Sequence, residues 1–335
     1  MPHNEEIDQL EKKYATVERQ EILIDLVNEE NQRKPALWLL IGIIAALVLA
    51  GIGILSYYNT SEATHTRVFE FTQTLFTKEL LFYILVGLAA QTVDGALGMA
   101  YGATSSSLLL GLGIPPSIAS ASVHVAEVFT TGASGISHFR FGNVNKKLFL
   151  YLLVPGMIGA VSGSFLLSKM NAISEAIPWL SYFKEDNIKP FISAYLLILG
   201  AIVLRKAFLP KKAKSKTKRL GSLAFFGGFM DSFGGGGWGP IVTSTLLSKG
   251  RTAHYTIGSV NAAEFFISLS SAGTFLIFGA IAGWPVIIGL IIGGVIASPF
   301  AAILVRRLKR KPLMIMVGSL IILLSLRTII LTLLH

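Results

Sequence analysis

The sequence predicts an all-α, polytopic membrane protein, on the strength of its composition, its long apolar runs and an internal repeat. Of the 335 residues, 52% are hydrophobic and only 14% are charged, whereas a soluble domain carries about 25% charged residues. The mean hydropathy is +0.63. Runs of roughly 20 apolar residues are each long enough to cross a hydrocarbon core about 30 Å thick; they lie at 35–58, 191–208, 284–305 and 313–334. These runs do not alternate with a period of two, which excludes a β-barrel.

An internal duplication organises the chain. Residues 91–142 match residues 228–279 without a gap, at an offset of 137 residues. Asp94 falls on Asp231 and Glu127 falls on Glu264, so acids match acids inside apolar sequence. A repeat of this kind predicts two related structural halves.

The basic residues predict the topology. The formal net charge is +10, and the cations gather in short clusters beside apolar runs, at Arg33-Lys34, Lys146-Lys147, Lys211–Arg219 and Arg306–Lys311. This is the positive-inside pattern rather than a nucleic-acid surface. Counting spans from these clusters places the N-terminus in the cytoplasm, the C-terminus outside, and the two halves in opposite orientations. Inverted repeats are typical of secondary transporters, which bind substrate near the midplane where the repeats meet. A location in the plasma or inner membrane of the cell follows.

Five segments are expected. They are a cytoplasmic polar, amphipathic helical segment at 1–34, an extra transmembrane helix at 35–58, a first repeat at 80–208, a basic cytoplasmic linker at 209–220, and a second repeat at 221–335. Each repeat would hold a broken, re-entrant hairpin followed by three spanning helices. The first apolar run follows 34 residues that include several acids, so it is expected to stay as a span rather than be a cleaved signal peptide. A scaffold or receptor role for the first segment is an alternative to a simple solvated helix.

Two glycine-rich breaks are the first functional candidates, at Asp94–Gly102 and Asp231–Pro240. Glycine costs about 1 kcal/mol relative to alanine inside a helix, and broken backbone survives in a membrane only where protein or a watery cavity satisfies it. The half-helix that follows each break has an N-terminus suited to an oxyanion. The expected substrate-binding residues are glycines of the breaks, hydroxyls of the half-helices and polar residues of the next helix: Gly102, Ser105, Ser106, Ser107, Ser122, His124, Gly236, Gly237, Gly239, Thr243, Ser244, Ser259 and Asn261. The alternative is that the glycines only permit close helix packing.

Four acids in apolar surroundings are the second set of candidates, because ionisable residues inside a membrane are costly. We expect Asp94, Glu127, Asp231 and Glu264 to take up protons during transport. Two alternatives stay open: protonated carboxyls that brace packed helices, or a cation site.

Enzymatic and metal chemistry have weak support. His124 lies three residues before Glu127, but its repeat mate is Asn261, so the pair lacks the symmetry of a metal site or of a catalytic base in both halves. There is no HExxH motif, no Ser/His/Asp spacing and no cysteine for a disulfide, a thiolate ligand or a nucleophile. We expect no enzymatic activity, no cofactor and no bound metal.

At this point the residues resemble the TauE/SafE sulfite exporter family, also called the sulfonate uptake permease family. The resemblance rests on the glycine-rich segments and the turns after them, at Gly95–Gly113 with Pro115-Pro116 and at Gly234–Gly250, and on the element Arg140–Val144. It covers about 80–333 and implies a secondary transporter that exports or imports sulfite or a related small sulfur oxyanion or organosulfonate. The first copy has Gly-Met-Ala-Tyr-Gly in place of the family's glycine triplet, so the exact substrate stays open.

An anionic substrate conflicts with four acids, since like charges repel strongly at low dielectric. The hypothesis is that the carboxyls are neutral when the anion binds, that hydroxyls and helix N-termini hold it, and that proton movement is coupled to alternating access. A cation or metal carrier using the same acids is the alternative. The expected partners are a small anionic sulfur compound and the lipid bilayer, with no nucleic acid; pairing into a homodimer is left open.

Overall fold

The computed structural model describes residues 78–97, 99–140, 142–208, 219–279, 283–307 and 310–334. Within these ranges every regular element is helical, as the sequence predicted. The segments expected at 1–34 and 35–58, and nearly all of the linker at 209–220, lie outside the described residues.

The first half begins with a broken hairpin. The hairpin is formed by α3 (Lys78–Leu97) and α4 (Tyr101–Gly111). The rest of the first half consists of α5 (Pro116–Arg140), α6 (Lys146–Ser168), the short α7 (Met170–Ala176), the 3₁₀ turn η1 (Pro178–Leu180) and α8 (Glu185–Lys206). The sequence indicated two short pieces in the hairpin, but α3 has 20 residues, about 30 Å of helix. Only α4, with 11 residues, is short.

The second half repeats this order. It consists of α9 (Leu220–Gly234), the π-helix η2 (Gly239–Thr243), α10 (Ser244–Ser248), α11 (Ala253–Ile277), α12 (Trp284–Arg307) and α13 (Arg310–Leu334). The bounds of α5 and α11 differ by 137 residues at both ends, which is the offset of the sequence repeat. The duplication is therefore a repeat of structural elements.

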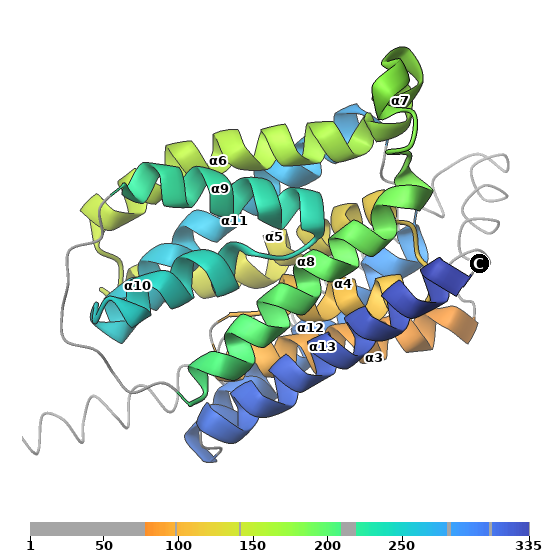
Figure 1. Cartoon of the computed structure of the whole chain (residues 1–335). Helices are drawn as coiled ribbons and strands as arrows, with labels where there is room; N and C mark the ends of the chain where they lie inside the picture. Colours follow the sequence, from red (N-terminus) through yellow and green to blue (C-terminus); the bar gives the residue numbers. More distant parts are fainter. Residues whose placement is uncertain are drawn as a thin grey trace, which may run out of the picture. The chain divides into compact units, whose positions relative to one another are not determined.

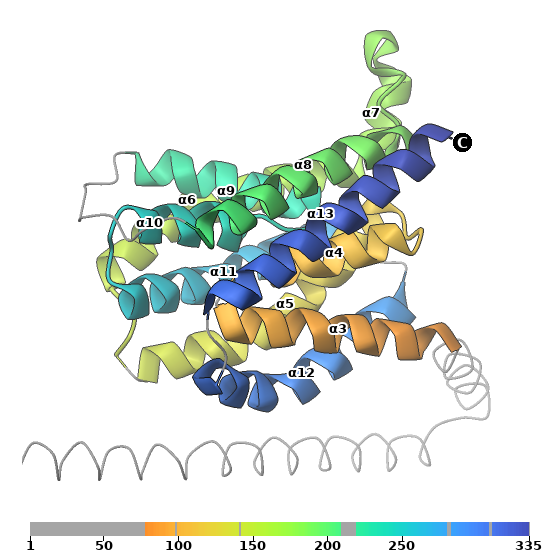
Figure 2. The same ribbon diagram turned by 60° about the horizontal axis from the view of Figure 1, so that its bottom comes forward.

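The two halves are interleaved. The broken helix α3 packs along α12, and its repeat mate α9 packs along α6 (Figures 1 and 2). Glycines make these contacts close: a Cβ on Gly163 of α6 would lie 2.3 Å from the Phe229 carbonyl oxygen, and one on Gly293 of α12 would lie 2.1 Å from that of Ile84. In addition α5 packs on α11 and α8 on α13, each helix against its own counterpart. Both halves thus share one centre.

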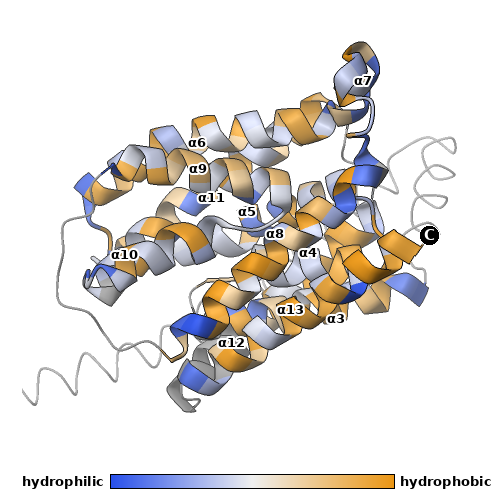
Figure 3. Ribbon diagram, in the orientation of Figure 1, coloured by the Kyte–Doolittle hydropathy of each residue, from blue (hydrophilic) through white to orange (hydrophobic). Residues whose placement is uncertain are grey.

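Several of these helices are long and apolar enough to cross a membrane. The qualifying segments in the described part are Lys146–Ser168, Asn187–Lys206, Tyr255–Ile277 and Met314–Leu334. Figure 3 shows apolar residues along most of α13 and hydrophilic ones around α7 and at helix ends. Large apolar side chains on α6, among them Leu150, Val154 and Ile158, are exposed, as expected of a surface that faces lipid. The chain is a multi-pass membrane protein.

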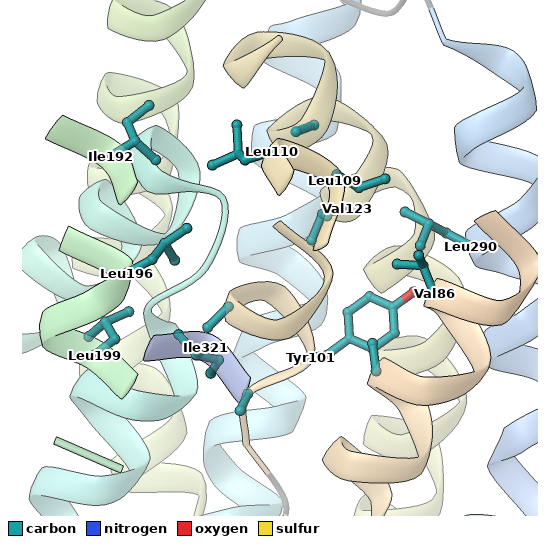
Figure 4. Close-up of a cluster of buried hydrophobic side chains, with 14 of the residues drawn as sticks. Val86, Tyr101, Leu109, Leu110, Val123, Ile192, Leu196, Leu199, Leu290 and Ile321 are labelled. Carbon is teal, nitrogen blue, oxygen red and sulfur yellow. The ribbon is translucent and has the colours of Figure 1, made fainter. Parts of the chain in front are cut away.

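The half-helix α4 is enclosed by the rest of the protein. Its Tyr101, Leu109 and Leu110 belong to a buried apolar cluster with residues of α3, α8, α12 and α13 (Figure 4). The four consecutive polar residues Thr104–Ser107 are buried with it. Their hydroxyls are therefore held inside protein and kept away from the lipid.

Candidate functional site

The two glycine breaks meet at the centre of the protein. A Cβ added to Gly102, in the first turn of α4, would lie 2.9 Å from the Cα of Gly236, and one added to Gly236 would lie 2.2 Å from the Ala103 nitrogen. Ser106 on α4 donates a hydrogen bond to the Gly235 carbonyl oxygen. Tyr195 on α8 donates to the Gly236 carbonyl oxygen at 2.9 Å. No side chain fits between the breaks, so these glycines serve close packing as well as the interruption of the helices.

Asp94 and Asp231 hold the ends of the breaks together. The carboxylate Oδ1 of Asp231 accepts from the backbone N–H of Trp238 at 2.9 Å. The backbone N–H of Tyr101, at the equivalent position in the first half, lies near the Asp94 carboxylate. Each aspartate thus caps the first turn of the half-helix that follows its own break, where a negative charge is favourable. The sequence had suggested that the N-terminal N–H groups of the half-helices bind an oxyanion. One of these N–H groups in each half-helix lies at an aspartate instead.

Glu127 on α5 reaches the same centre. Its side chain is buried, and its Oε2 accepts from the Ser268 hydroxyl of α11 at 3.1 Å. Its Oε1 lies 3.1 Å from the position that a Cβ of Gly102 would take. Glu264, the repeat mate on α11, is partly exposed and lies close enough to Glu127 for their charges to interact.

His124 connects α5 to the end of α9. The ring is buried, with Nδ1 2.7 Å from the Ser120 carbonyl oxygen and Nε2 3.3 Å from Oδ2 of Asp231. One helical turn earlier, the Ser120 hydroxyl donates to the Ser232 carbonyl oxygen at 2.6 Å. The first half is therefore bound to the second break by two side chains of α5.

Some hydroxyls near the breaks have no protein partner. Within the described residues these include Thr104 and Ser107 on α4 and Thr243 on η2, all of which are buried. A buried polar group without a partner costs about 1–3 kcal/mol. These hydroxyls are therefore free to donate to a ligand.

The remaining predicted site residues have other surroundings. Ser105 is buried on α4, Gly237 lies against the Tyr195 hydroxyl, and Gly239 lies against Met99. The Ser244 hydroxyl donates to the Pro240 carbonyl oxygen and accepts from Nζ of Lys206.

Three predicted residues connect helices outside the contact of the breaks. Ser122 lies beside Gly283, just before α12. The Ser259 hydroxyl accepts from the Asn145 N–H at 2.9 Å, and the Asn261 side chain donates to the Ser134 hydroxyl at 3.1 Å. The predicted substrate-binding residues thus fall into two groups: those that lie at the breaks and those that join helices elsewhere.

Sequence reasoning missed Ser120, Ser268 and Tyr195. Ser120 lies one helical turn before His124, and Ser268 occupies the repeat position of Thr131, whose hydroxyl donates to the Glu127 backbone carbonyl at 2.5 Å. The repeat therefore gave a weak indication that Ser268 lies near a glutamate. We find no signal in the sequence for Tyr195, which lies in an apolar run.

Three side chains could in principle face one ion. His124, Glu127 and Asp231 each offer an atom, and these atoms lie within 4.8 Å of one another. Both ring nitrogens of His124 and both carboxylate oxygens of Asp231 already contact protein atoms. Glu127 accepts from Ser268. Protein hydrogen bonds thus account for the arrangement without a metal.

A helical membrane protein whose two broken hairpins meet at a buried centre, lined by acids and unpartnered hydroxyls, has the architecture of a membrane transporter. The chain belongs to the TauE/SafE family, whose model, described as Sulfite exporter TauE/SafE, matches residues 83–328. The resemblance seen in the sequence is thereby confirmed, and the family is one of membrane transporters.

Two curated relatives agree with this assignment. The chain is 43% identical over 263 residues to the probable membrane transporter protein YtnM of Bacillus subtilis (strain 168), a match that covers 76% of this chain and 83% of the relative. It is 29% identical over 126 residues to the Sulfite exporter TauE/SafE family protein 3 of Arabidopsis thaliana, covering 38% of this chain and 25% of the relative. No solved structure matches.

Proposed function

We propose that this protein is a secondary transporter that moves sulfite, or a related small sulfur oxyanion or organosulfonate, by alternating access coupled to protons. Membership of a family described as sulfite exporters supports the substrate class. The observation that carries the mechanism is the contact of the two breaks, Gly102 against Gly236. Broken helices that meet at the repeat interface are where transporters of this architecture bind their substrates.

The unpartnered hydroxyls form the anion site in this proposal. Thr104, Ser107 and Thr243 supply donors on the half-helices, and Thr104 lies in the first turn of α4, where the partial positive charge of a helix N-terminus adds to it. Asp94 and Asp231 already take one N–H each, so the hydroxyls carry most of the recognition. The nearby carboxyls are neutral when the anion is bound, which removes the repulsion between like charges.

Each acid also differs in exposure from its repeat mate, with one buried acid in each half, and this difference supports alternating access. Glu127 and Asp231 are buried, whereas their repeat mates Glu264 and Asp94 are partly exposed. Repeat mates in different environments are expected when one half has taken the conformation that the other adopts in the opposite state. The exchange of these environments would move access from one side of the membrane to the other.

A cation carrier is the second candidate. The gathering of His124, Glu127 and Asp231 favours it, but the protein hydrogen bonds made by these residues favour the oxyanion.

Flux into proteoliposomes tests the proposal directly. Full-length protein is reconstituted, and uptake of sulfite, sulfate, an organosulfonate and Zn²⁺ is compared with and without a pH gradient. We expect sulfite or the organosulfonate to move and Zn²⁺ not to move. Transport of Zn²⁺ alone would establish the cation carrier instead.

Substitution of a free hydroxyl sharpens the test. Thr104→Ala is expected to weaken apparent sulfite affinity about tenfold or more, because a hydrogen bond to a charged group contributes about 1.5–3 kcal/mol. Ser162→Ala is the matched control, since that hydroxyl bonds only to its own helix, at the Ile158 carbonyl oxygen. Equal affinities in the two variants would remove Thr104 from the anion site.

The carboxyl pair is tested separately. In the variant that combines Glu127→Gln with Glu264→Gln, we expect sulfite flux to lose much of its response to an imposed pH gradient, because neither side chain can then take up a proton. A pH response equal to that of wild type would show that these glutamates do not couple protons to transport.

A further inference from the structure

The repeat mates His124 and Asn261 make different contacts, although they occupy the same position in the two halves. His124 faces Asp231 at the end of α9. By the repeat, Asn261 would face Asp94, but its amide is bonded to Ser134 instead. One of the two equivalent contacts is therefore made and the other is not.

The contacts of His124 determine where its protons lie. The Ser120 carbonyl oxygen can only accept, so the ring nitrogen Nδ1, 2.7 Å away, carries a hydrogen. Oδ1 of Asp231 is used by the Trp238 N–H, and Oδ2 faces Nε2 of the ring at 3.3 Å. A bare Nε2 and an ionised carboxylate are both acceptors and cannot bond to each other. The contact therefore requires a second proton between the ring and the carboxyl.

We propose that His124 and Asp231 together bind the transported proton, and that this shared proton is the latch that holds α5 of the first half against the second break. The proposal rests on the proposed function, since it names the coupling site of that transporter. It assigns the proton to a pair that joins the two halves, whereas the sequence suggested the acids alone and placed His124 among the substrate-binding residues.

The groups around the pair are mainly acidic. Glu127 lies on the same helix, Asp94 lies on α3, Glu264 lies on α11, and the Tyr195 hydroxyl of α8 lies close enough to Asp231 to sense its charge. Phe275 of α11 covers the ring, with 6.2 Å between the ring centroids. Where these carboxyls are ionised their charge favours a protonated ring, and burial of the ring opposes it.

Loss of the proton opens the latch. The Nε2 lone pair and the carboxylate would then face each other in a dry interior, where unpaired acceptors are costly. The hydrogen bond from the Ser120 hydroxyl to the Ser232 carbonyl oxygen would still join α5 to the end of α9. In the second half Asn261 has no titratable proton, so the latch itself binds one proton per cycle.

Nitrogen NMR of histidine tests the shared proton without any substrate. Full-length protein carrying ¹⁵N-histidine is placed in nanodiscs, and the His124 signals are assigned by their loss in His124→Asn. We expect both ring nitrogens of His124 to carry protons in wild type, and only Nδ1 to do so in Asp231→Asn. His138→Asn, on the same helix, is the control and should leave the His124 signals unchanged.

Steady-state accumulation of sulfite in proteoliposomes tests the coupling. With one coupled proton, the ratio of internal to external sulfite is expected to shift about tenfold for each unit of imposed pH difference, since one pH unit is a tenfold change in proton activity. His124→Asn, which installs the residue of the repeat mate, is expected to show no such shift. His138→Asn should behave as wild type, and the protonation of sulfite itself is the same for all three proteins.

The outcomes separate the two proposals. A His124 ring that carries one proton throughout the pH range of the folded protein, or a wild-type shift in His124→Asn, would overturn the latch. If wild type moves no sulfite, the proposed substrate fails while the NMR experiment still decides on the shared proton. If His124→Asn moves nothing at all, the proton count in wild type and in Asp231→Asn decides.

Discussion

Asp94 and Asp231 have a local role that would be needed even without any transport. A helix that stops and restarts inside a membrane leaves backbone N–H groups without water to satisfy them. Each aspartate lies seven residues before the N–H at the start of the following half-helix; Asp231 accepts from this N–H, and Asp94 lies near it. The acids at the breaks are thus caps, and Asp231 also contacts His124.

Asp94 allows this capping role to be tested apart from the histidine contact, because the histidine contacts Asp231 whereas Asp94 lies near the Tyr101 N–H. Asp94→Ala is expected to lower the free energy of unfolding by about 1 kcal/mol or more, as for the loss of other helix caps. Asp94→Asn keeps an acceptor oxygen and should lose less. Thermal unfolding in detergent measures both; equal midpoints for wild type and Asp94→Ala would rule out a capping contribution.

At the scale of helices, the decisive feature is the contact between two breaks that lie far apart in the sequence. Gly102 and Gly236 touch backbone to backbone, and Ser106 and Tyr195 bond to the carbonyls of the second break. The bonds supply partners for exposed backbone, which lipid cannot do. The first half therefore stabilises the interruption in the second.

Gly236→Ala tests this contact, because the added Cβ would lie 2.2 Å from the Ala103 nitrogen. Overpacking of this kind typically costs about 1–3 kcal/mol, and sulfite flux should be lost as the breaks are forced apart. Gly273→Ala is the matched control: this glycine is inside α11, and its Cβ would meet nothing within 4 Å.

In the control, thermal stability should stay the same or rise, since alanine is favoured over glycine inside a helix by about 1 kcal/mol. If Gly236→Ala unfolds at the wild-type temperature and transports normally, the breaks do not need their close contact.

For the whole molecule, the opposite orientation of the halves remains a prediction from the basic clusters. The sequence places the loops at 112–115 and 169–189 outside and the loop at 249–252 inside. The first and last of these loops are repeat mates, so opposite locations would show the inversion directly.

The absence of cysteine makes this orientation testable by labelling. Leu112, Ser181 and Thr252 are exposed, so each can be replaced singly by cysteine. A membrane-impermeant maleimide should label Leu112→Cys and Ser181→Cys in intact cells, but Thr252→Cys only after the membrane is opened. Labelling of Leu112→Cys and Thr252→Cys from the same side would mean that the halves are parallel.

The sequence alone determined the class of fold, the two repeated halves and the positions of the breaks. It could do so because apolar length, glycine content and repetition are properties of the chain itself, and a bilayer demands helices wherever the chain crosses it. The acids were likewise visible as charges in apolar sequence.

The tertiary structure decided which repeat mates make equivalent contacts and which do not. His124 contacts Asp231, whereas Asn261 bonds to Ser134. Three further residues of the site were identified only by their hydrogen bonds to partners more than 40 residues away: Ser120, Ser268 and Tyr195. The physical reason is that hydrogen bonds between distant helices depend on the packing of the two halves. The sequence places His124 and Asn261 at the same repeat position, and only the packing of the helices gives them different partners.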